Sequence, residues 1–125
     1  AELYTRVCKN WPRGDVPADF YKIPPAPSPV LVMSGGADPA TPPRHGERVA
    51  QALAVGHPER VQHLVVPESG HGVMAVGCVR DLLFRFIDAK NDAQALPDSF
   101  KADAACATRI PRPPAFQPVQ GGTAK

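Results

Sequence analysis

Proline is the residue that most restricts the fold of this chain, because it fixes the backbone angle φ and cannot donate a backbone hydrogen bond. Sixteen of the 125 residues are proline, and most of them lie in residues 12–43 and 111–122. Helices and buried strands are therefore expected mainly between about residues 28 and 90. A chain of this length forms at most one domain with a modest core.

Two apolar runs in that part predict buried strands, at residues 30–34 and 61–66. Between them, Thr41 offers a hydroxyl as N-cap, prolines occupy the first helical turn, and apolar residues recur at helical spacing up to Gly56. A stripe of apolar residues predicts a second helix from about residue 76 to 89. The order strand, helix, strand, helix indicates the α/β class, a βαβα unit with a parallel sheet and a right-handed crossover.

This βαβα unit is expected to be incomplete on its own. Two parallel strands leave outer edges with unpaired backbone groups, which a longer sheet normally satisfies with further strands. The sequence opens on Ala1, without methionine and without a signal peptide before the first strand. We therefore expect that an upstream part of the protein has been removed from this chain.

Two polar residues follow the carboxyl ends of the predicted strands: Asp38 after the first, and His71, between two glycines, after the second. Ligands and chemistry occupy that edge in open α/β sheets. A carboxylate there can accept the ring N–H of a histidine, fix its tautomer and stabilise the imidazolium. The order Asp then His matches the last two members of the hydrolase order Ser, Asp, His. We therefore predict Asp38 as triad acid and His71 as general base.

The nucleophile is not expected in this chain, because no serine lies in a G-x-S-x-G turn between a strand and a helix. The nearest approach is Ser34 before two glycines, which we interpret as the end of a buried strand. The remaining histidines have no acidic or metal-ligating neighbour at a useful spacing along the sequence. His45, His57 and His63 are therefore interpreted as ordinary helix, loop and strand residues.

Charge, hydropathy and cysteine spacing exclude several classes of function. The net charge of +2 comes without any basic run, which argues against a nucleic-acid partner. The longest apolar runs are far shorter than the ~20 residues that a membrane span needs. No CxxC and no paired histidines occur, so no metal or other cofactor is expected. An odd count of three, Cys8, Cys78 and Cys106, predicts one cysteine paired outside the chain in an oxidising compartment, or three free thiols in a cytosolic protein.

Taken together, these motifs resemble the C-terminal segment of the tripeptidyl-aminopeptidase-like α/β-hydrolases, relatives of the proline iminopeptidases. The shared pattern consists of Pro29 to Val32, Gly35, Asp38, Thr41-Pro42, Gly70-His71-Gly72, Cys78 and Cys106, with Cys8 and Trp11-Pro12 ahead of it. The likeness covers roughly residues 8–106. We expect a Pro-rich extended lead-in at residues 1–27, the C-terminal part of an α/β-hydrolase domain at 28–106, and a Pro-rich disordered tail at 107–125.

The resemblance implies a secreted or periplasmic serine exopeptidase that removes short peptides or single residues from free N-termini. It carries over Asp38 as triad acid and His71 as triad base. It also implies a disulfide between Cys78 and Cys106, which would pin an otherwise loose tail, and a bond from Cys8 to a cysteine outside the chain. The partner is then the N-terminal remainder of the hydrolase, which supplies the serine, the oxyanion hole and the peptide pocket, and the chain alone is expected to be inactive.

Two alternatives remain open at this point. The chain could be a non-catalytic binding or interaction module that keeps a hydrolase-like fold. It could also be a fragment of a cytosolic ester or epoxide hydrolase, which would share Asp38 and His71 but would have no use for disulfides.

Overall fold

Two parallel strands, β1 (Val30–Gly35) and β2 (Val61–Val66), form the centre of the structure, a computed structural model that describes residues 2–114. The strands are in register along their whole length, from Val30 opposite Val61 to Gly35 opposite Val66. Their runs of branched apolar residues fit a pleated sheet that is covered on both faces. The predicted parallel pair is confirmed.

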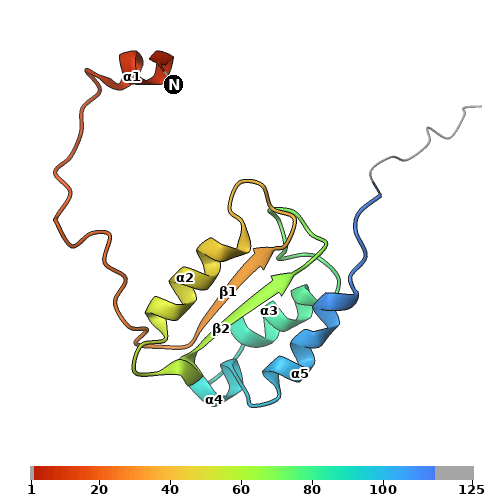
Figure 1. Ribbon diagram of the computed structural model, residues 1–125. Helices are drawn as coiled ribbons and strands as arrows, with labels where there is room; N and C mark the ends of the chain where they lie inside the picture. Colours follow the sequence, from red (N-terminus) through yellow and green to blue (C-terminus); the bar gives the residue numbers. More distant parts are fainter. Residues whose placement is uncertain (1, 115–125) are drawn as a thin grey trace, which may run out of the picture.

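Helix α2 (Pro43–Leu53) covers one face of this sheet (Figure 1). Ala50 of the helix packs with Val61 of β2 and with the partly buried Val30 and Val32 of β1. Proline at the start of the helix suits its first turn, where the backbone N–H groups have no partner within the helix. After α2, the 3₁₀ turn η1 (Pro58–Arg60) leads directly into β2.

The opposite face is covered by α3 (Val79–Ile87), α5 (Phe100–Ala104) and the 3₁₀ helix η2 (Ala105–Arg109), with the one-turn helix α4 (Asp92–Ala95) between α3 and α5 (Figure 1). This side holds the larger core cluster, whose buried members are Leu64, Val66, Val73, Val79, Leu82, Phe100 and Ala107. Helix α3 begins later than expected because Gly77, at φ +48°, turns the chain just before it. The layers are therefore helix, sheet, helix, as expected of an α/β unit.

The segment expected as an extended lead-in contains a helix, α1 (Glu2–Cys8). These seven residues precede the first proline, and Glu2 and Arg6 suit the helix dipole at the two ends. From residue 9 to the first strand the chain is irregular and almost entirely exposed, and it carries α1 away from the sheet (Figure 1).

The segment after α3 belongs to the core and is not a loose tail. Phe100 is 6% exposed and Ala107 is 1% exposed, and Ile110 packs against the same cluster. A disulfide joins Cys78, just before α3, to Cys106 in η2, with 6.4 Å between their Cα atoms. The expectation of a disordered tail from residue 107 is therefore wrong for residues 107–110, which pack against the core. Residues 115–125 of the expected disordered tail lie outside the described residues.

Candidate active site

The loops that follow β1 and β2 lie together at the carboxyl edge of the sheet. The N–H of Gly36 donates to the carbonyl of Val66 over 2.8 Å, and the N–H of Ala37 donates to the carbonyl of Ser69 over 3.0 Å. A Cβ on Gly35 would clash with the backbone carbonyls of Ser69 and Gly70. Glycine at this position therefore allows the two loops to meet.

Asp38 and His71 meet where these loops meet. His71 Nδ1 lies 2.8 Å from Asp38 Oδ2. The Asp38 side chain is only 3% exposed, whereas the His71 side chain is 73% exposed. A buried carboxylate thus orients a histidine ring whose other side faces solvent. The structure brings together the two residues that the sequence singled out.

The Asp38 carboxylate is held by its own turn. Oδ1 accepts hydrogen bonds from the N–H of Ala40 at 2.8 Å and of Thr41 at 3.1 Å, and Oδ2 accepts one from the Thr41 hydroxyl at 2.6 Å. The pKa of Asp38 is held well below its usual range, chiefly by the hydrogen bond from the Thr41 hydroxyl. The His71 ring and the two backbone N–H groups lower this pKa further, while burial has the opposite effect. Asp38 is therefore ionised at neutral pH.

Thr41 does not cap α2 as the sequence predicted. The N-cap residue is Pro42, without a side-chain hydrogen bond to the helix, and the Thr41 hydroxyl turns to Asp38 instead. Hydroxyl side chains often prefer such a local partner to a helix end. Thr41 is thus a residue of the site, a role that was missed at the sequence level.

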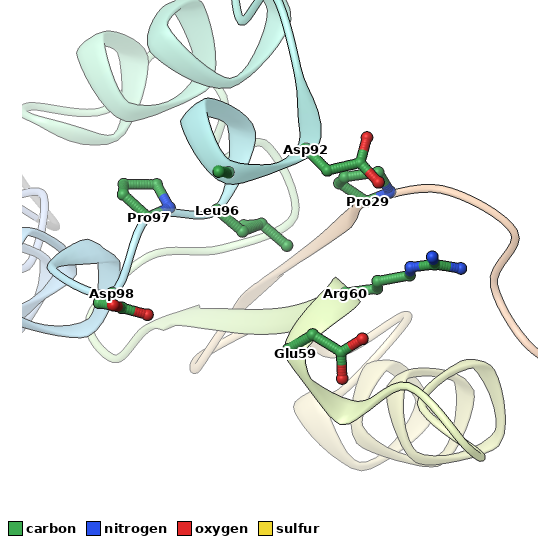
Figure 2. Close-up of a pocket in the computed structure, with 8 residues that line it drawn as sticks. Pro29, Glu59, Arg60, Asp92, Leu96, Pro97 and Asp98 are labelled. Atoms are coloured by element: carbon green, nitrogen blue, oxygen red, sulfur yellow. The ribbon is translucent and has the colours of Figure 1, made fainter.

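A cavity of about 290 Å³ adjoins the pair. Asp38, Thr41 and His71 line it on the loop side, the β1 residues Val32, Met33 and Ser34 line it on the sheet side, and His45 lines it from α2. A larger hollow, of about 530 Å³, lies at the other end of the sheet, next to the residues that precede β1 and β2 (Figure 2). Its lining, including Glu59, Arg60 and Asp92, contains no serine, cysteine or histidine, so it offers no nucleophile or histidine base.

His63 lies in strand β2 as predicted, but it has an acidic partner in space, which its sequence neighbours do not reveal. Its Nδ1 lies 3.0 Å from Glu47 Oε2 in α2, and its Nε2 lies 2.9 Å from Ser34 Oγ at the end of β1. The order serine, histidine, acid resembles a catalytic triad. However, a Cβ on Gly46 would lie 2.6 Å from Ser34 Oγ, so the backbone of α2 covers this serine. The cluster joins the helix to the sheet.

The other two histidines differ in their surroundings. His57 lies 3.2 Å from Glu59 at an exposed turn, contrary to the expectation that it has no acidic neighbour, while His45 lines the cavity beside the pair.

No group of three or more histidine, cysteine, aspartate or glutamate side chains within residues 2–114 could hold a metal ion. Over the same residues, no helix has the length and apolar character needed to cross a membrane. Cys8 is free and exposed in α1.

Comparison with known proteins places the chain in a family. The family model described as TAP-like protein, an α/β-hydrolase model, matches residues 1–96. No curated protein and no solved structure matches the chain significantly. The match spans β1, α2, β2 and α3, and it therefore includes both loops that carry Asp38 and His71. The chain belongs to the TAP-like family of α/β-hydrolases.

Proposed function

We propose that this chain supplies the acid and the base of a serine hydrolase, with Asp38 as the acid and His71 as the base. The observation that carries the proposal is the 2.8 Å contact between Asp38 Oδ2 and His71 Nδ1 at the carboxyl edge of a parallel sheet. In such a pair the free ring nitrogen takes the proton of a serine hydroxyl as that oxygen attacks a carbonyl carbon. The same proton then goes to the leaving amine or alcohol, while Asp38 stabilises the imidazolium between the two steps.

The serine, the oxyanion hole and the substrate pocket come, in this proposal, from an N-terminal remainder of the hydrolase domain. Among the described residues β1 pairs with β2 alone, and the apolar residues of β1 are only partly buried. Strand edges are normally covered. The unpaired edge of β1 therefore supports a further segment beside that strand.

We further propose a peptide substrate and an extracytoplasmic location. The sequence resembles peptidases that remove short peptides or single residues from free N-termini, and the family match supports hydrolase ancestry. The Cys78–Cys106 disulfide favours an oxidising compartment, where such bonds persist. The exposed Cys8 is then available to a cysteine in the N-terminal remainder.

The first test replaces His71 in a version of the protein extended upstream to include the serine-bearing segment. His71→Ala should lower kcat on tripeptidyl or aminoacyl anilides by at least about 1,000-fold, because general-base assistance is lost. The matched control is His57→Ala, since His57 is also exposed and paired with a carboxylate but lies away from the site. Folding should be unchanged in both variants, as judged by circular dichroism.

Four results would contradict parts of the proposal. Substantial residual turnover in His71→Ala would remove His71 from the catalytic machinery. Turnover by the 125-residue chain alone that is sensitive to serine-directed inhibitors would show that the nucleophile lies within this chain. If the extended protein is inactive on anilides but cleaves esters or epoxides, its chemistry is that of another hydrolase class. If it turns over none of these substrates, the result favours a binding module.

A further inference from the structure

Thr41 contacts both members of the Asp38–His71 pair. Its hydroxyl oxygen lies 2.6 Å from Asp38 Oδ2 and 3.2 Å from His71 Nδ1, so the three atoms form a closed triangle with the 2.8 Å contact between Asp38 and His71. The Thr41 side chain carries one proton that it can donate, and an ionised carboxylate can only accept. The positions of the protons in this triangle can therefore be worked out from its distances.

Only one arrangement places a proton on each of the two shortest contacts. The Thr41 hydroxyl donates to Asp38 Oδ2, because no other proton is available for the 2.6 Å oxygen–oxygen contact. His71 Nδ1 must then carry the ring proton and donate it to the same oxygen, with the Thr41 oxygen as a second, weaker acceptor. If Nδ1 were unprotonated, it would face Asp38 Oδ2 at 2.8 Å with no proton between two acceptors.

We propose that Thr41 is the positioning residue of the pair: its hydroxyl aims Asp38 Oδ2 at His71 Nδ1 and keeps the second ring nitrogen, Nε2, free to take a proton. This inference rests on the proposed function, because it concerns how the same base is prepared. The hydroxyl acts through Asp38, and only the carboxylate contacts the base strongly. Loss of the hydroxyl leaves Oδ1 held by two backbone N–H groups but leaves Oδ2 with His71 alone.

The position of Thr41 is itself determined by helix α2, which begins two residues later at Pro43. The helix is held to the sheet where Gly46 packs on Ser34 and His63, and where Glu47 contacts the His63 ring. The helix start on one side and the Asp38 turn on the other fix the backbone at Thr41, and the exposed side chain is held by its contacts with Asp38 and His71. The hydroxyl is thus preorganised for its two partners.

The test uses Thr41→Val, which removes the hydroxyl but keeps the side-chain shape and the backbone N–H, and Thr41→Ser, which restores the hydroxyl. The matched control is Thr108→Val, because Thr108 bonds only a backbone carbonyl in η2, away from the site. In the 125-residue chain, ¹³C resonances follow the titration of the Asp38 carboxyl, and ¹⁵N resonances report which nitrogen of the neutral His71 ring carries the proton. In the upstream-extended protein, kcat and KM are measured on the same anilides.

We expect the neutral His71 ring to be protonated at Nδ1 in the wild type. Thr41→Val should raise the titration midpoint of Asp38 and lower kcat by about 10- to 100-fold at unchanged KM, the range expected for one hydrogen bond to a charged group. Thr41→Ser and Thr108→Val should behave as the wild type. A merely structural role would lower stability but would leave the Asp38 midpoint unchanged.

Two results would overturn the inference: a wild-type ring protonated at Nε2, or an Asp38 midpoint that is the same in Thr41→Val as in the wild type. Failure of the proposed function gives a different pattern. In that case the nuclear magnetic resonance results follow expectation, while the extended protein has no hydrolase activity or is insensitive to His71→Ala.

Discussion

The disulfide between Cys78 and Cys106 yields the most quantitative prediction. It closes a loop with a sequence separation of 28 residues, and for that separation the chain-entropy relation predicts a stabilisation of about 3.6 kcal/mol at 25 °C. Domains of this size are typically stable by about 5–15 kcal/mol in total. The Cys78→Ala/Cys106→Ala double variant should therefore lose a large fraction of its free energy of unfolding.

The structure also predicts which elements lose stability when the disulfide is removed. Cys106 lies in η2 beside Ala107, and Phe100 of α5 packs into the same core as Val66 and Val79. The bond thus holds part of the core in place. Amide hydrogen exchange should speed up in α5 and η2 as well as in the neighbouring strand β2.

The assay is urea unfolding of the oxidised chain followed by far-ultraviolet circular dichroism, since Trp11 lies exposed in the irregular segment before β1 and does not report on the core. Cys8→Ala is the matched control, because Cys8 is free and exposed. A loss below about 1 kcal/mol in the double variant, or an equal loss in Cys8→Ala, would refute the reasoning, because the entropy of a loop of this length could not then be the main effect.

Two further predictions concern α2 and Asp38. Gly46→Ala should lower the free energy of unfolding by about 1–3 kcal/mol, because the added Cβ would lie 2.6 Å from Ser34 Oγ. The control Gly14→Ala should leave the free energy of unfolding unchanged, because nothing lies within 4 Å of its added Cβ. A Gly46→Ala variant that is more stable than the wild type would contradict this packing. Asp38 has a pKa in the folded state below the ~3.9 of an unfolded chain. Its ionised carboxylate therefore contributes fully to the free energy of unfolding above about pH 5, and this contribution is lost as the pH falls toward the pKa in the folded state. Urea midpoints measured from neutral to acidic pH should fall less steeply in Asp38→Asn, and equal slopes would contradict this cause.

The parts of the molecule that depend on local pattern could be predicted from the sequence. The strands are continuous apolar runs that end in turns, and Asp38 and His71 could be paired because the carboxyl ends of adjacent parallel strands share one edge. Helices α4 and α5 could not be predicted from the sequence, because four or five residues are too few to show an apolar stripe at helical spacing.

Contacts that depend on strand register and on competition for hydrogen bonds were also missed. Ser34 and His63 come together because Val32 lies opposite His63, which brings both side chains to the face that α2 covers. No spacing along the chain encodes that register. Thr41 had two possible partners, the start of α2 and the Asp38 carboxylate, and only the three-dimensional turn decides between them.

The contact of Gly46 with the sheet has a consequence for anyone who wishes to redesign this protein. The inward side of α2 rests on Ser34 and His63, and Thr41 lies two residues before the helix, so a change that shifts α2 is expected to shift Thr41 and, through it, Asp38 and His71. The outward side, which includes Arg44, Arg48 and Gln51, is exposed. Single charged or reactive side chains placed on that outward side should therefore leave the contact between Asp38 and His71 unchanged.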